Sequence, residues 1–221
     1  MWKTILTILF PIHCLGCNQE GNFICFNCFN KLPLNTELPL DNLLISSYYK
    51  NPLIKNMIHR YKYDFVKELA RPLGLLMVKK LNNFPNEFNK NNSILIPVPL
   101  HKKRLKWRGF NQSELLAQVI SQELDIPVIN NILIRTKYTL PQVKTQNIKQ
   151  RKENMNQSFT LPKEKIIRKR FSFYRPDLGL TGKTIILIDD VSTTGATLKQ
   201  AVQTLQPLQA KQIWKLVLAR G

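Results

Sequence analysis

Acidic residues are scarce in this chain of 221 residues: 14 Asp and Glu stand against 33 Lys and Arg, for a formal net charge of +19. An enzyme that handles one small phosphorylated substrate does not need such an excess of positive charge. The excess favours contact with a polyanion, and among polyanions nucleic acid fits best. The chain is also rich in Asn, Lys and Ile, so a general compositional bias is the alternative explanation.

Long hydrophobic runs are absent as well, and no stretch reaches the length of a membrane span. The apolar start at residues 5–10 is too short for a signal-peptide core and is interrupted by Pro11. His13, which precedes Cys14, spoils a lipoprotein cleavage site, because that site needs a small residue there. We therefore expect a cytoplasmic protein. Its 43% of hydrophobic residues suffice for one good-sized core and a small appendage.

Cysteine is confined to one short segment. The four cysteines form two C-x-x-C pairs, Cys14 with Cys17 and Cys25 with Cys28, and four thiolates complete a tetrahedral zinc shell. Gly16 permits the tight turn that lets backbone amides face the sulfurs. A disulfide is disfavoured in a reducing compartment, and a redox C-x-x-C normally stands alone, so an iron–sulfur centre is the alternative that stays open.

The cysteine segment is too small to build a hydrophobic core without a metal ion. We expect a zinc module over residues 1–35, with a core separate from that of one larger domain over residues 36–221. The ligands alone do not determine whether the module touches nucleic acid.

The most informative stretch lies at residues 185–198. Ile185–Ile188 indicates a short strand buried on both faces, and Asp189 and Asp190 follow at its carboxyl end, where open α/β sheets bind their ligands. A loop of small and hydroxyl residues then leads into a helix; it contains Ser192, Thr193, Thr194, Gly195, Ala196 and Thr197. Such a loop can surround a phosphate, and paired carboxylates can accept hydrogen bonds from vicinal hydroxyls. The pattern therefore predicts a ribose 5-phosphate site; the alternative is an ordinary turn with a helix cap.

A charged segment follows the strand expected at residues 93–100. It includes Pro99, His101, Lys102, Lys103, Arg104, Trp107, Arg108 and Phe110. We expect a loop here, in which basic groups hold a diphosphate or the phosphates of DNA and the two aromatic rings stack on bases. The alternative is a solvated turn with Trp107 packed onto the core.

The rest of the chain alternates between expected strands and helices. Strands are expected at residues 43–49, 93–100, 185–188 and 213–219, with shorter extended pieces at 127–129, 132–134 and 159–161. Helices are expected at residues 53–66, 70–81, 113–124 and 197–205. The polar stretch 135–157 fits a mobile loop over the site, and 163–182 is a long basic and aromatic stretch. This order predicts an α/β fold.

Two resemblances rest on these motifs. The segment Ile185–Leu198 resembles the phosphoribosyl pyrophosphate motif of type I phosphoribosyltransferases. Together with the four cysteines, the sequence PVPLH, and the residues Arg104 and Arg108–Gln112, it resembles the ComF family over nearly the whole chain. The resemblance implies a type I phosphoribosyltransferase fold, with a central and mainly parallel sheet flanked by helices, and a small N-terminal zinc knuckle.

The resemblance also implies roles and partners. Asp189 and Asp190 would hold the ribose hydroxyls of phosphoribosyl pyrophosphate, and Thr193–Thr197 would hold its 5-phosphate. Mg²⁺ would bridge the diphosphate and ribose oxygens and keep several waters. ComF proteins are linked to competence, the uptake of single-stranded DNA, which implies single-stranded DNA and a helicase or channel protein of DNA uptake as partners.

Two classes of function stay open. As an enzyme, the chain would be a phosphoribosyltransferase, in competence or in purine and nucleotide salvage, whose acceptor attacks C1 of the ribose as pyrophosphate leaves. As a binding module without catalysis, it would sense the ligand while basic segments hold DNA. No nucleobase pocket is recognisable in the sequence, so it assigns neither the acceptor nor a catalytic residue.

Overall fold

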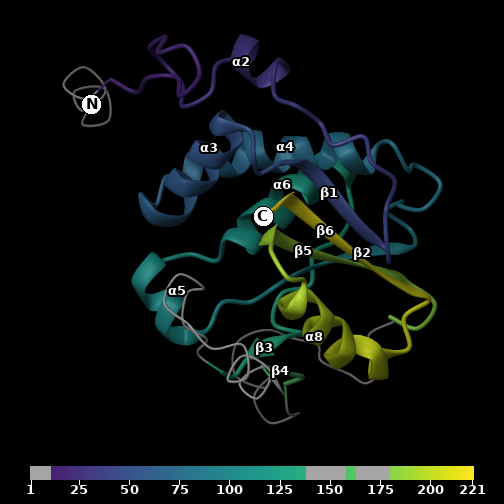
Figure 1. Cartoon of the computed structure of the whole chain (residues 1–221). Coiled ribbons are helices and arrows are strands. Elements are labelled where there is room, and N and C mark those ends of the chain that lie inside the picture. The colour runs from purple at the N-terminus through teal and green to yellow at the C-terminus, as the bar shows by residue number, and fades with distance from the viewer. Residues whose placement is uncertain (1–10, 138–157, 163–179) are drawn as a thin grey trace.

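A parallel sheet forms the centre of the molecule in the computed structural model, which describes residues 11–137, 158–162 and 180–221 (Figure 1). Its four strands are β1 (Leu43–Tyr48), β2 (Ser93–Pro97), β5 (Thr184–Ser192) and β6 (Gln212–Arg220). They lie in the order β1-β6-β5-β2, and each neighbouring pair is parallel. The expected parallel sheet is confirmed, whereas most of the two stretches expected at 135–157 and 163–182 lies outside the described residues.

The strands form because they are apolar on both faces. All five residues of β2 are buried, and so are Thr184–Ile188 at the start of β5. β5 does not end at Ile188 as expected but continues through both aspartates to Ser192. Next to β2, residues 127–129 contribute only an isolated parallel bridge, through two 2.9 Å backbone hydrogen bonds with Leu95.

Helices cover both faces of the sheet. α3 (Pro52–Tyr63), α4 (Ala70–Leu81) and α6 (Gln112–Leu124) lie on one face, and α8 (Ala196–Leu205) lies on the other (Figure 1). Alternate residues of β5 join different cores, because successive side chains of a strand point to opposite faces. Ile186 and Ile188 pack with α3, α4 and α6, whereas Ile185 and Leu187 pack with α8. The four expected helices are confirmed, with small shifts at their ends.

Two local features hold the helices that frame the site. The side chain of Asn51 caps α3 by accepting a 3.0 Å hydrogen bond from the backbone N–H of Ile54, and Pro52 occupies the first turn. α4 and α6 approach closely at Gly74, where an added Cβ atom would lie 2.7 Å from the side chain of Val119. These contacts fix α3 and α6, whose ends face the end of β5.

The basic segment after β2 is not the expected loop, because it forms a short helix, α5 (Lys102–Arg108). The side chain of His101 caps it by accepting a 3.2 Å hydrogen bond from the backbone N–H of Lys103. Gly109 ends it with a left-handed backbone at φ 77°. Five of the seven residues of α5 are Lys or Arg, so few apolar positions are left to reveal the helical pattern.

The cysteine segment packs on the main core instead of having a separate one. Its short helix α2 (Phe26–Asn30) follows Cys25, and the partly buried apolar residues of the segment contact the core around α3 and α4; these are Leu15, Phe23, Ile24 and Phe29. The ammonium of Lys79, on α4, lies 4.4 Å from the ring centre of Phe29. The expectation of independent cores is therefore wrong, because the segment covers one end of the helical layer.

Smaller elements complete the described part. β3 (Ile134–Arg135) and β4 (Phe159–Thr160) form an antiparallel pair, and single 3-10 turns lie at Lys67–Leu69 and Gln206–Leu208. The extended pieces expected at 132–134 and 159–161 thus become one short ribbon below the sheet (Figure 1). None of the helices that the structure describes is long and apolar enough to cross a membrane.

Candidate functional site: an acid pair beside a hydroxyl loop

Two carboxylates mark the carboxyl end of β5. Asp190 follows Ile186 and Ile188 on the face covered by α3 and α6, and it is only 7% exposed. Asp189 is partly exposed. The helices of that layer supply hydrogen-bond donors to both carboxylates, so the acid pair is built into the fold and is not a surface turn.

Asp190 is held by three donors. Its Oδ1 lies 3.0 Å from Lys62 Nζ and accepts a 2.6 Å hydrogen bond from the backbone N–H of Val191. Its Oδ2 accepts a 3.3 Å hydrogen bond from Gln112 Nε2. The sequence interpretation missed Lys62 as part of the site, because Lys62 belongs to α3, far along the chain from the acid pair on β5.

Asp189 is held less completely. Its Oδ1 accepts hydrogen bonds from Ser113 Oγ at 3.1 Å and from the backbone N–H of Asp190 at 2.9 Å. Its Oδ2 accepts no hydrogen bond from any residue that the structure describes. Burial, aided by the neighbouring charge of Asp190, raises the pKa of Asp189 to about 7. Asp189 is partly exposed and its Oδ2 lacks a donor among the described residues, so this oxygen is suited to accept a ligand hydroxyl.

The hydroxyl loop follows the acid pair and leads into α8. Gly195 adopts a left-handed backbone with φ 73° just before the first helical residue, and Thr194 Oγ1 accepts a 3.5 Å hydrogen bond from the backbone N–H of Ala196. Thr193 and Thr197 are partly exposed, and Thr194 is exposed. The sequence pattern places Ser192 in the loop, but Ser192 is the buried last residue of β5 and so belongs to the strand.

The structure divides the basic segment into exposed and buried residues. Lys102, Lys103 and Trp107 are exposed, and Pro99, His101 and Arg104 are partly buried. Phe110 is only 7% exposed and packs on Tyr61, with ring centres 5.6 Å apart. The prediction that Phe110 stacks on bases is therefore wrong, because its ring already has a partner in the core.

Arg108 is the buried member of the basic segment, with 9% exposure. Its guanidinium lies 5.8 Å from the ring centre of Tyr63 and 5.7 Å from that of Trp107. Burial lowers its pKa from the usual range, and the charge of Asp190 opposes that change. Arg108 therefore faces the acid pair and the aromatic rings, which limits its access to an outside phosphate.

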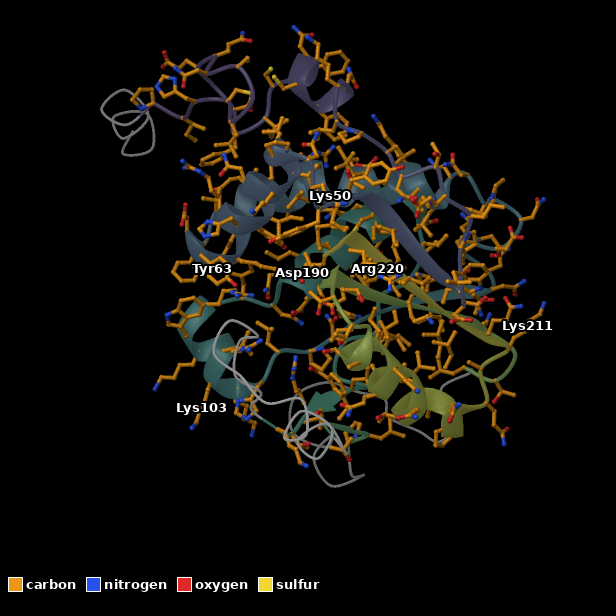
Figure 2. All side chains as sticks on the ribbon, viewed as in Figure 1. Lys50, Tyr63, Lys103, Asp190, Lys211 and Arg220 are labelled. Carbon is orange, nitrogen blue, oxygen red and sulfur yellow. The ribbon has the colours of Figure 1, made fainter. Side chains whose placement is uncertain are left out.

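Three aromatic side chains form an exposed patch, called here the aromatic cluster. Trp107, Tyr63 and Phe65 are 57%, 48% and 38% exposed, and the ring of Trp107 lies 5.0 Å from Phe65 and 6.5 Å from Tyr63. Tyr63 and Phe65 follow a basic helix end in the sequence, a signal that the sequence interpretation did not use. Tyr63 is the last residue of α3 and follows Lys62, which pairs with Asp190; Figure 2 labels both Tyr63 and Asp190. The exposed stacking surface is thus beside the acid pair.

The junction between α5 and α6 carries buried polar atoms without partners. Arg108 Nε, Asn111 Oδ1 and Gln112 Oε1 have no hydrogen-bond partner in the described part of the chain. The amide of Asn111 donates from Nδ2 to the carbonyl of Val98 at 3.2 Å, and that of Gln112 donates to Asp190, so both amides are fixed in place. Unpaired buried polar atoms in a native protein are uncommon, and they point to a site that a ligand or water completes.

The four cysteines lie together as predicted. Their sulfur atoms are all within 4.8 Å of one another, which suits a tetrahedral thiolate shell. Burial raises the pKa of the Cys14 thiol, but hydrogen bonds from the backbone N–H groups of Cys25 and Gly16 outweigh it and bring the pKa to about 6. Backbone amides that face the sulfurs are the arrangement expected around bound zinc, so the residues present fit the metal.

A separate cavity of about 580 Å³ lies between α8, β1 and the segment 35–41. Ser192 and Gly195 border one side of it, and Lys199, Lys215 and Arg220 add positive charge. Neither Asp189 nor Asp190 lines it. The cavity therefore adjoins the hydroxyl loop without forming part of the acid pair.

Known proteins resemble both halves of the chain. Residues 111–221 match the family described as "Phosphoribosyl transferase domain". "Competence protein F" of Haemophilus influenzae is 32% identical over 213 residues, which are 96% of this chain and 86% of that protein. "DNA utilization protein YhgH" of Escherichia coli is 29% identical over 195 residues, 87% of this chain and 76% of that protein. The adenine phosphoribosyltransferase structure of Leishmania tarentolae is 12% identical with a TM-score of 0.46, covering 83% of this chain and 94% of that one.

Proposed function

Since the chain belongs to the ComF family of competence proteins and carries a phosphoribosyltransferase domain, we propose that it binds phosphoribosyl pyrophosphate with Mg²⁺ at the acid pair and hydroxyl loop. We propose further that it binds single-stranded DNA beside that site, in the cytoplasm. Structural zinc in the four-cysteine cluster belongs to the same proposal, and the division at residue 35 stays a prediction.

The proposed sugar-phosphate site rests on one observation. β5 carries Asp189 and Asp190 near its end, and a loop of hydroxyl residues then leads to the N-terminus of α8. Asp189 offers an open oxygen for a ribose hydroxyl. The backbone N–H groups at the start of α8 and the hydroxyl residues Thr193, Thr194 and Thr197 beside them are of the kind that binds a 5-phosphate. A site that accepts a diol next to a site that binds a phosphate favours a ribose phosphate over ribose alone or phosphate alone.

Mg²⁺, when bound, would neutralise the charge of the diphosphate that leaves. The residues present fit the ion, because Mg²⁺ takes carboxylate oxygens and Asp189 Oδ2 accepts no hydrogen bond from the described residues. Lys102, Lys103 and Arg104 lie on α5, after the strand that neighbours β5, and supply positive charge for the diphosphate.

As an enzyme, the chain would work by positioning and charge neutralisation and not by covalent catalysis. An acceptor nucleophile forms a bond to C1 of the ribose while the bond from C1 to the pyrophosphate oxygen breaks. Pyrophosphate leaves with the electron pair, and the acceptor's proton passes to solvent or to a nearby base. Asp189 and Asp190 hold the ribose hydroxyls throughout, which keeps C1 in a fixed position.

Single-stranded DNA is supported by the aromatic cluster and by the charge of +19. The exposed rings of Trp107, Tyr63 and Phe65 can stack on unpaired bases, which a duplex does not offer. Lys102, Lys103 and Lys106 of α5 are exposed beside them and can bind phosphates. The name of the Haemophilus relative supports a role in competence, where a DNA-uptake helicase or channel protein is the partner we propose.

Two assays on the full chain test the proposal and separate the classes of function. Equilibrium binding of phosphoribosyl pyrophosphate with Mg²⁺ tests the ligand. Release of pyrophosphate in the presence of nucleobases or oligonucleotides tests turnover. Binding of the ligand with release of pyrophosphate supports the enzyme, and the added compound that causes the release is its acceptor. Release with nucleobases alone indicates salvage. Binding without release supports a ligand-sensing DNA-binding module, and no binding overturns the proposal.

A further inference from the structure

Lys62 is a lysine on α3 whose ammonium is withdrawn from water. It pairs with Asp190 at 3.0 Å, with side chains 18% and 9% exposed. The other ion pairs in the described ranges are more exposed: Arg60 with Asp64, Arg71 with Glu123, and Lys90 with Asp125. Exposed pairs contribute little, whereas a shielded pair is costly to break on one side, because the remaining charge stays buried.

The backbone around Lys62 leaves its side chain little freedom to face elsewhere. Tyr61, immediately before it, is fully buried, and its hydroxyl donates a 2.8 Å hydrogen bond to the carbonyl of Gln112. Tyr63, immediately after it, lies in the aromatic cluster. The helix end is thus anchored on both sides of Lys62, which directs its ammonium at the acid pair.

The oxygens of the acid pair show what Lys62 does there. Asp190 Oδ1 has two partners, Lys62 and the N–H of Val191, so its lone pairs are filled. Among the residues that the structure describes, Asp190 Oδ2 has only Gln112 as a partner and keeps capacity for one more donor. Lys62 therefore occupies one oxygen of Asp190 and turns the other toward the remaining donors of the site.

We propose that Lys62 is a positioning residue for the sugar ligand, which pairs with Asp190 and fixes its carboxylate so that its Oδ2 accepts a ribose hydroxyl. This inference rests on the proposed ribose site. Lys62 does not need to touch the ligand, because it acts through Asp190 alone. A carboxylate that is both charged and fixed binds a hydroxyl more strongly than one that is free to turn.

The test compares three variants of the full chain in titration calorimetry with ribose 5-phosphate and with inorganic phosphate. Lys62→Met removes the ammonium and keeps much of the side-chain volume, Lys62→Arg keeps the charge, and Lys55→Met removes an exposed lysine of the same helix as the control. Lys62→Met should lower the affinity for ribose 5-phosphate on the order of tenfold, as expected for the loss of one charge-assisted interaction. Its affinity for inorganic phosphate should stay within about twofold, Lys62→Arg should recover most of the loss, and Lys55→Met should match the wild type.

A double variant keeps the test valid if Lys62→Met folds poorly. Lys62→Met combined with Asp190→Asn removes both charges, so no buried charge is left alone. It should bind ribose 5-phosphate as Asp190→Asn does, because Lys62 acts only through Asp190. Equal affinity of Lys62→Met and the wild type, or an equal loss for inorganic phosphate, overturns the inference. A wild-type chain that binds no ribose 5-phosphate overturns the proposed site instead.

Discussion

The hydroxyl of Tyr61 donates a 2.8 Å hydrogen bond to the backbone carbonyl of Gln112, and this bond joins α3 to the start of α6. Both residues are buried. Both are close to the groups that hold Asp190. Tyr61 is followed by Lys62, which pairs with Asp190, and the side-chain amide of Gln112 donates a hydrogen bond to Asp190. Burial, strengthened by the charge of Asp190, raises the pKa of the Tyr61 phenol, so it stays a hydrogen-bond donor.

Replacing Tyr61 by Phe should therefore loosen the support of the acid pair. Tyr61→Phe removes one buried hydrogen bond, while the Gln112 carbonyl, at the start of α6, keeps its bond within the helix. The loss should lower the free energy of unfolding by about 0.5–1.5 kcal/mol. Urea denaturation measures this change. Tyr63→Phe, on the exposed side of the same helix end, is the matched control and should cost less than about 0.5 kcal/mol. Equal costs for the two variants would show that the bond to Gln112 contributes nothing.

The affinity for ribose 5-phosphate should depend on the ionisation of Asp189, whose pKa is raised to about 7. Hydroxyls donate to a carboxylate, so the affinity should rise from pH 6 to pH 8. Inorganic phosphate corrects for ionisation of the ligand, and the ratio of the two affinities is the quantity to measure. Asp189→Asn should give a flat ratio. A wild-type ratio that is flat across this range contradicts the role of Asp189.

Stability should change in the opposite sense over the same range. A carboxyl whose pKa rises from 3.8 unfolded to about 7 folded binds its proton more tightly in the folded state. Its contribution is fully present below pH 4 and is lost as pH rises toward 7. The difference in unfolding free energy between the wild type and Asp189→Asn should therefore shift against the wild type from pH 5 to pH 8. Denaturation curves in which the two proteins change in parallel would refute this.

Zinc should be present at about one ion per chain, bound by the four cysteines. Cys25→Ser should lose the metal and also lower the melting temperature, because the apolar residues of the cysteine segment pack on the main core. Elemental analysis and thermal melting check both statements. A zinc-free chain with the same melting temperature, or a coloured iron centre, would contradict them.

Trp107 and Phe110 should respond differently to truncation, although both are aromatic. Trp107→Ala should lower the affinity for a single-stranded oligonucleotide on the order of tenfold, since one stacked base contributes about 1–3 kcal/mol. Leu105→Ala, an exposed residue of the same helix, is the matched control and should have little effect. Phe110→Ala should instead destabilise the fold by about 3–5 kcal/mol. If fluorescence anisotropy gives the same oligonucleotide affinity for Trp107→Ala and the wild type, the aromatic cluster does not bind DNA.

The sequence could predict the parallel sheet, its covering helices and the place of the acid pair, because local hydrophobic patterns determine these. It could not predict the partners of the acids. Gln112 lies 78 residues from Asp190 along the chain and Tyr61 lies 51 residues from Gln112, so only the folded packing brings them together. The sequence wrongly favours DNA contact for Phe110 for the same reason, because its ring packs on Tyr61, which is remote along the chain. The charge of α5 hid a helix that capping by His101 and Gly109 defines.

The measurement that tests the central claim most directly is titration calorimetry of the full chain with phosphoribosyl pyrophosphate and Mg²⁺, for the wild type, Asp189→Asn and Lys55→Met. The claim predicts one bound ligand per chain for the wild type and Lys55→Met. It predicts a loss on the order of tenfold or more for Asp189→Asn, because a hydroxyl loses its charged acceptor. No binding to the wild type, or equal affinity in Asp189→Asn, would contradict the claim.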